Sequence, residues 1–135
     1  DLPKPDPARI VAFGRGLGSG VATYRAAERP VVATILATPF DSAVAVARAV
    51  YPRLPVSLLL RHRFESIARA PQLRAPLLML VATDDRVIPN PHSERLYVAW
   101  AGTKRVTRID GADHTDVASD PRYWGAISAF LTAFQ

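Results

Sequence analysis

Residues 9–22 read RIVAFGRGLGSGVA, and this stretch decides how the rest of the chain is interpreted. The apolar run at 10–13 has the composition of a short buried strand. It ends in closely spaced glycines and passes directly into a small-residue pattern that begins a helix near Leu17. The stretch therefore predicts a strand, a very tight turn and a helix.

Three kinds of functional site use this arrangement, and the glycine spacing distinguishes them. A phosphate loop requires a Lys after its second glycine, and the turn contains none. A dinucleotide-binding turn follows G-x-G-x-x-G, but Ser19 stands where the third glycine belongs, and residues 33–36 lack the acid that would bind a ribose. The nucleophile elbow G-x-S-x-G matches Gly14–Gly18 at every position except the serine, which is replaced by Gly16.

The bulk composition is typical of one globular domain or part of one. The chain has 135 residues, of which 49% are hydrophobic and 21% charged. No apolar run is long enough to cross a bilayer. We therefore expect a soluble, cytoplasmic protein without a membrane span.

Charge and ligand patterns disfavour several other classes of protein. Lys and Arg number 17 and Asp and Glu 12, but the basic residues are spread singly along the chain. Nucleic-acid binding would favour a clustered basic face with interleaved aromatic residues. The chain also has no Cys and no paired-His spacing for a metal. We expect no nucleic-acid partner, no metal and no other cofactor.

Strand-like runs alternate with helical patterns from the glycine turn to the end of the chain. Two proline-rich segments interrupt this order: 1–8, expected to be a connector, and 51–75, expected to be an irregular cover with one helix at 64–70. The alternation predicts an α/β domain with a parallel sheet and helices on both faces. The expected pairs of strand and helix are 10–13 with 17–28, 31–38 with 43–50, 76–82 with 91–100, and 105–109 with 123–134.

Some polar and small residues have ordinary structural explanations in this arrangement. Gly18 and Gly20 are expected to let the first helix lie close on the sheet. Asp41 or Ser42 is expected to cap the helix at 43–50.

Two further expectations concern which side chains face solvent. His62 and His92 have no motif context and are interpreted as surface residues. The last helix carries an apolar stripe that predicts its buried face. Its members are Trp124, Ile127, Phe130, Leu131 and Phe134.

Gly16, Asp85 and His114 each come directly after an expected strand, where chemistry collects in open parallel sheets. A nucleophile, an acid and a histidine follow in this order in α/β-hydrolases. Four motifs match that family in order and spacing, so residues 1–135 resemble a single partial α/β-hydrolase domain, the carboxy-terminal half from the elbow strand onward. These motifs are the elbow at 14–18, PFDS at 39–42, D-x-x-x-P at 85–89 and G-A-x-H at 111–114.

The resemblance implies a role for each of these residues. His114 would be the general base, and Asp85 the acid that fixes its tautomer. The backbone N–H of Leu17 would be one donor of the oxyanion hole. Asp84 is a rival acid, although Asp85 fits the spacing to the following proline better. Asp41 is the candidate if the acid instead lies in the loop after the second strand.

Two departures from the family pattern affect the function that the resemblance implies. Gly16 replaces the attacking serine, so no acyl-enzyme can form there, and Ser19 lies a helical turn away. The earlier strands of the family precede this chain's first residue. The strand at 10–13 is therefore expected to have an open apolar edge that favours self-association or pairing with a missing amino-terminal half.

The resemblance then implies an esterase-like serine hydrolase that acts on a small-molecule ester or acyl substrate. With Gly16 at the nucleophile position, we expect it to be an inactive or severely impaired variant. The alternative is a non-catalytic binding or interaction module on the same scaffold.

Overall fold

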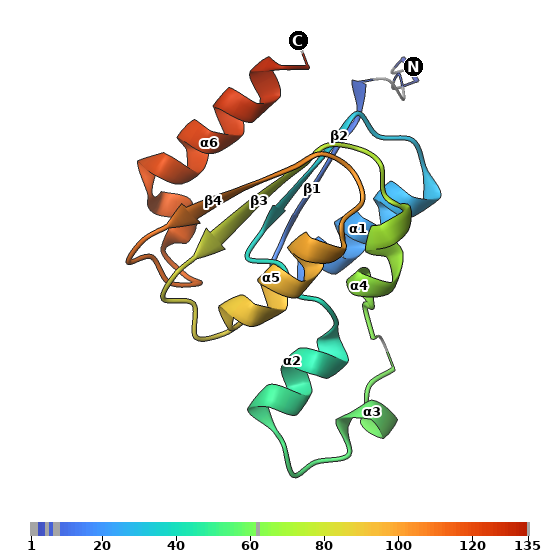
Figure 1. The fold of residues 1–135 in the computed structure, drawn as a ribbon, viewed down its shortest axis with the longest axis vertical. Helices are drawn as coiled ribbons and strands as arrows, with labels where there is room; N and C mark the ends of the chain where they lie inside the picture. The colour runs from blue at the N-terminus through green and yellow to red at the C-terminus, as the bar shows by residue number, and fades with distance from the viewer. Residues whose placement is uncertain (1–2, 5, 7–8, 62, 135) are drawn as a thin grey trace.

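Four parallel strands form one sheet in the computed structural model, which describes residues 3–4, 6, 9–61 and 63–134 (Figure 1). The strands lie side by side in chain order, and their register aligns Phe13 with Ile35, Ile35 with Leu78 and Leu78 with Arg105. Their bounds are β1 Val11–Arg15, β2 Ala33–Ala37, β3 Leu77–Ala82 and β4 Lys104–Ile109.

The two central strands are the most apolar and the most buried. Every residue of β2 and β3 is buried, because helices cover both faces of the sheet. Strand β4, at one edge, instead exposes Lys104, Arg105 and Arg108. The prediction of a parallel α/β sheet with helices on both faces is confirmed.

The helices connect successive strands and divide between the two faces of the sheet. The longest are α1 Leu17–Glu28, α2 Ala43–Val50, α5 Asn90–Ala99 and α6 Pro121–Thr132. Shorter ones are α3 Val56–Leu59, α4 Ser66–Arg69, η2 Ala70–Gln72 and η3 Val117–Ser119. In Figure 1, α2 and α3 extend away from the sheet.

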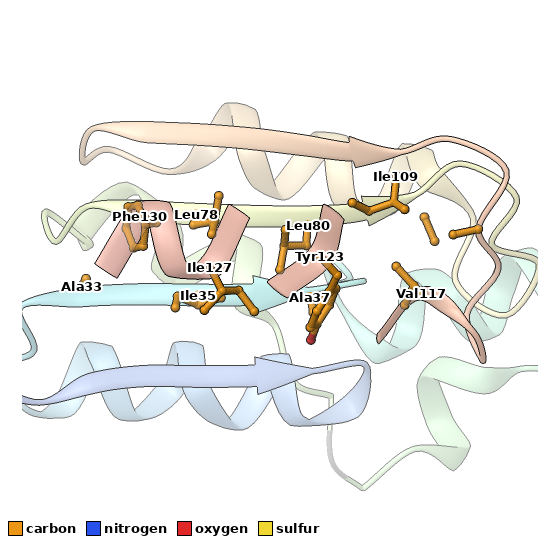
Figure 2. Close-up of a cluster of buried hydrophobic side chains, with 12 residues drawn as sticks. Ala33, Ile35, Ala37, Leu78, Leu80, Ile109, Val117, Tyr123, Ile127 and Phe130 are labelled. Atoms are coloured by element: carbon orange, nitrogen blue, oxygen red, sulfur yellow. The ribbon is translucent and has the colours of Figure 1, made fainter. Parts of the chain in front are cut away.

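Helix α6 covers one face of the sheet. Its buried residues Tyr123, Ile127 and Phe130 pack against side chains of β2 and β3 such as Ile35 and Leu80 (Figure 2). The opposite face is covered by residues of α1, α5 and η2, and the buried members of that cluster include Ala22, Ala70, Leu96 and Trp100.

The buried stripe of α6 differs in part from the predicted one. Trp124 is 55% exposed and Phe134 is also exposed, whereas Tyr123 is almost fully buried. The helix begins at Pro121 with Asp120 as its N-cap, which turns position 123 toward the sheet. The indole of Trp124 instead donates a hydrogen bond to the carbonyl of Ala118 at 2.7 Å.

Two glycines allow close contact around α1, and a third does not. A Cβ on Gly14 would lie 2.3 Å from the carbonyl oxygen of Gly18, and one on Gly20 would lie 2.9 Å from Cβ of Phe64. A Cβ on Gly18 would have no neighbour within 4 Å. The expected role of Gly18 and Gly20 in packing α1 against the sheet is therefore wrong. Gly20 lies close to Phe64 in the loop before α4, and β1 approaches the backbone of Gly18 through Gly14.

The two proline-rich segments agree only in part with their predicted structure, as far as the described residues show. The helix expected at 64–70 is shorter, since α4 ends at Arg69 and continues as the 3-10 turn η2. Most of the connector expected at 1–8 lies outside the described residues.

Within the described part of the chain, no helix has the length and apolar character needed to span a membrane.

Candidate active site

The glycine turn between β1 and α1 has the sharp geometry of a nucleophile elbow. Gly16 separates the last residue of β1 from the first residue of α1 and has φ 55° and ψ −123°. A positive φ of this size favours glycine, because an L side chain is strained there. Hydrogen bonds on both sides hold the turn. The Gly16 amide donates to the Ala37 carbonyl at 3.0 Å, and the Gly16 carbonyl accepts from the amide and the hydroxyl of Ser19 at 3.0 and 2.6 Å.

Asp85 lies in the loop after β3, and its carboxylate is almost fully buried. One oxygen, Oδ1, accepts hydrogen bonds from the amides of Val87 and Ile88 at 2.9 and 2.8 Å. The other, Oδ2, lies 2.8 Å from Nδ1 of His114. The side chain of Asp85 is only 2% exposed, so the loop fixes the direction in which the carboxylate meets the imidazole.

His114 lies in the loop after β4 and faces the elbow. Because an ionised carboxylate can only accept hydrogen bonds, the proton between His114 and Asp85 belongs to Nδ1 of the imidazole. In the neutral ring, Nε2 is then an acceptor. A Cβ built on Gly16 would lie 3.4 Å from this Nε2. The structure thus brings the three predicted positions Gly16, Asp85 and His114 together.

Arg15 and Asp113 hold the histidine loop. The guanidinium of Arg15 donates to the His114 carbonyl at 2.6 Å. The carboxylate of Asp113 accepts hydrogen bonds from the amides of Thr115 and Asp116 at 2.7 and 2.9 Å. These backbone hydrogen bonds hold the pKa of Asp113 below its usual value. No sequence pattern marks either residue for this role, although Arg15 lies inside the elbow motif itself.

An apolar cavity of about 570 Å³ opens beside Gly16 and His114. One wall is the face of α2 that carries Ala43, Val46, Ala47 and Val50. The remaining lining residues are Arg15, Leu17, Phe40, Tyr51, Val87 and Ile88. The small apolar residues of α2 predict a helix but not its position, so this wall of the cavity does not follow from the sequence.

The amide of Leu17 lies at the amino end of α1, directly after Gly16. Leu17 is the first residue of α1, and the first amides of a helix have no acceptor within the helix. They also lie at the positive end of the helix dipole.

The two rival acids do not contact His114. Asp84 is exposed, and its amide donates to the carbonyl of Ala112. The carboxylate of Asp41 binds the Nδ1 of His92 at 2.8 Å and the Nε of Arg95 at 2.7 Å. Asp85 is therefore the acid that the structure places beside the histidine.

The contacts of Asp41 correct the expectation for one histidine. His92 is buried rather than on the surface, because it pairs with Asp41 from 51 positions away. His62 lies outside the described residues.

Burial raises the pKa of Asp41, but hydrogen bonds from Arg95, His92 and the Ser42 amide outweigh this effect and lower the pKa below its usual value. Ser42 alone caps α2, accepting from the Ala45 amide at 3.0 Å.

Among the residues that the structure describes, no three His, Asp or Glu side chains are grouped so as to hold a metal ion.

Some known proteins are similar to this chain in sequence. No protein-family model matches the sequence. An uncharacterized protein of Mycobacterium tuberculosis is 40% identical over 111 residues, which are 82% of this chain and 40% of that protein. The alpha/beta hydrolase domain-containing protein aho-3 of Caenorhabditis elegans is 25% identical over 123 residues, 91% of this chain and 36% of that protein. The chain spans about two fifths of the length of these relatives.

Solved structures show the same fold. An acetyl xylan esterase from Paenibacillus sp. R4 superposes with a TM-score of 0.78 at 20% identity, covering 96% of this chain and 46% of that chain. A monoacylglycerol lipase of Paleococcus ferrophilus superposes with a TM-score of 0.70 at 20% identity, covering 94% of this chain and 69% of that chain. The chain therefore has the α/β-hydrolase fold, and the resemblance predicted from its four motifs is confirmed.

Proposed function

We propose that this chain carries the elbow, acid and histidine of an esterase-type α/β-hydrolase whose nucleophile position is occupied by Gly16. One observation carries the proposal. The Nε2 of His114, whose ring is fixed by Asp85, lies 3.4 Å from where a Cβ on Gly16 would be. A serine there would present its hydroxyl to the base.

The proposed roles follow from this geometry. With a serine at position 16, His114 would take the hydroxyl proton, Asp85 would stabilise the imidazolium, and the Leu17 amide would bind the oxyanion. Gly16 has no hydroxyl, so the acyl-enzyme route is closed and activity is severely reduced. Ser19 does not replace it, because its side chain is fully buried and donates to the Gly16 carbonyl.

The cavity supports an apolar acyl group as the part of the substrate held beside the site. Its α2 wall offers only aliphatic side chains, and among the described lining residues Arg15 and His114 alone carry an ionisable nitrogen. An uncharged ester or acyl compound would bury apolar surface there without bringing a charge of its own out of water. Two of the proteins with a similar fold are an acetyl xylan esterase and a monoacylglycerol lipase.

Restoring the hydroxyl tests the proposal. Gly16→Ser in the full-length natural polypeptide should react covalently with a fluorophosphonate and hydrolyse a short-chain nitrophenyl ester. The matched control is Gly16→Ser combined with His114→Gln, which keeps the serine and removes the base. A folded Gly16→Ser variant that neither labels nor turns over would contradict the proposal.

A binding module is the second candidate, favoured by the apolar cavity beside a residue without a hydroxyl. On this reading the natural protein binds an apolar ester or its carboxylic acid and leaves it unchanged. Calorimetry with a non-hydrolysable ether analogue, together with the inactive outcome for Gly16→Ser, would select this candidate over the hydrolase.

We also propose that β1 pairs with another chain segment, from a second copy or from elsewhere in the natural polypeptide. Among the described strands, β1 pairs with β2 alone, and Phe13 is 49% exposed. Unpaired strand edges favour association. Light scattering of the 135-residue chain should show association, and a clean monomer would contradict this.

A further inference from the structure

We infer that the natural site, with Gly16 in place, hydrolyses activated esters by direct attack of water, with His114 as the general base. This inference rests on the proposed function and deepens it, because it names the nucleophile that the chain itself does not provide. The products are the carboxylic acid and the alcohol, and no acyl-enzyme forms.

The base is prepared for this role by the groups around it. Asp85 accepts a hydrogen bond from the Nδ1–H of His114, and Asp85 is itself fixed by the amides of Val87 and Ile88. The Nε2–Cε1 edge of the ring lies beside Gly16, since a Cβ there would be 3.4 Å from Nε2 and 3.5 Å from Cε1. The imidazole side chain is 23% exposed, so solvent reaches it.

Gly16 provides the space for the nucleophile. A Cβ at this position would be in ordinary van der Waals contact with the ring of His114 and with no other described side chain nearby. In a hydrolase with serine, this volume and the space beyond it hold the side chain. With glycine, a water molecule has room to approach Nε2 at hydrogen-bonding distance, about 2.6–3.2 Å. The same position faces the apolar cavity, which would hold the acyl group.

The proposed step balances without any further reactant. Nε2 of His114 takes one proton from water as the water oxygen bonds to the ester carbonyl carbon. The carbonyl oxygen becomes an oxyanion beside the Leu17 amide. On collapse, the bond from the carbonyl carbon to the alcohol oxygen breaks, and the Nε2 proton passes to that leaving oxygen. Esters with good leaving groups are favoured, since water is a weak nucleophile.

The test compares the natural protein with His114→Gln on nitrophenyl butyrate, after circular dichroism has shown that both are folded. We expect the natural rate to exceed the His114→Gln rate by about 10²-fold, the lower end for general-base catalysis. The time course should be linear from the first turnover, and intact-mass analysis should show no acyl adduct. Asp85→Asn should lower the rate as well, whereas Asp84→Asn, an exposed neighbour, should not.

Two outcomes would overturn the inference. Equal rates for the natural protein and His114→Gln would show that the imidazole activates nothing. A burst with an acyl adduct would show that a side chain attacks instead of water. The Gly16→Ser variant shows whether such a result overturns only the direct attack of water or also the proposed hydrolase function. If that variant labels with fluorophosphonate while the natural protein matches His114→Gln, the hydrolase proposal stands and direct water attack does not.

Discussion

The imidazole Nδ1 of His114 lies 2.8 Å from Oδ2 of Asp85, although 29 positions separate the two residues in the chain. One residue follows β3 and the other follows β4, and these parallel strands are neighbours in the sheet. Their carboxyl ends therefore bring the two loops together. The pairing orients Nε2 toward Gly16, and the predicted chemistry depends on that orientation.

Asp85→Asn should reduce the esterase activity of the Gly16→Ser variant by roughly 10⁴-fold, because an amide no longer holds the imidazole in the required tautomer. Asp84→Asn and Asp41→Asn are the matched controls, since neither carboxylate contacts His114. Steady-state kinetics on nitrophenyl acetate measures the effect. A larger loss in either control than in Asp85→Asn would reassign the acid.

Gly14→Ala should lower the free energy of unfolding by about 1–3 kcal/mol, because its Cβ would lie 2.3 Å from the Gly18 carbonyl and 2.7 Å from Cβ of Ala22. Gly125→Ala is the control, since it is exposed in α6 and a Cβ there has no neighbour within 4 Å. That substitution should stabilise the protein by up to about 1 kcal/mol. Urea unfolding measures both, and equal effects would contradict the close approach of β1 and α1.

Ala47→Phe should fill part of the cavity and shift the Gly16→Ser variant toward shorter acyl chains. We expect kcat/KM for a nitrophenyl octanoate to fall by roughly 10-fold relative to the acetate, as in hydrophobic pockets generally. Ala49→Phe introduces the same side chain at an exposed position of α2 that does not line the cavity. An unchanged chain-length preference in Ala47→Phe would place the acyl group elsewhere.

Asp41→Asn should make the free energy of unfolding less dependent on pH below neutrality. The pKa of Asp41 is lowered in the folded state from an ordinary value of 3.8. Its carboxylate therefore contributes stability above that ordinary value, and the contribution is lost as the pH falls through the lowered pKa. At neutral pH the variant should lose on the order of 2 kcal/mol, since Arg95 and His92 lose a charged acceptor.

Chemical denaturation between pH 7 and pH 2 measures this dependence. Natural protein and Asp41→Asn should differ most at neutral pH and converge in acid. A difference that stays constant across the whole range would show that the carboxylate charge is not the source of the stability.

Local sequence was enough to predict the strand and helix order and the elbow. Small residues are needed where a strand passes into a helix within one residue, so Gly14 and Gly16 indicate the position of the turn between β1 and α1. Asp85 and His114 could be predicted as loop residues after strands, because parallel topology brings strand ends together.

Other features depended on contacts between distant residues. The burial of His92 results from Asp41 on another loop, and no local pattern around position 92 indicates it. Periodicity in the last helix could not decide between the neighbouring aromatics Tyr123 and Trp124, because the helix start at Pro121 sets which one faces the sheet. The cavity wall depended on where α2 lies relative to the sheet.

Gly16→Cys tests the central claim, that position 16 faces the base, most directly. The chain has no cysteine of its own, so alkylation by iodoacetamide reports on this thiol alone. His114 and the amino terminus of α1 should lower the pKa of the thiol well below its usual value of about 8.5. Alkylation should then be rapid near neutral pH and should slow markedly when His114→Gln is added. Identical pH profiles with and without His114, both centred near the ordinary thiol value, would contradict the account.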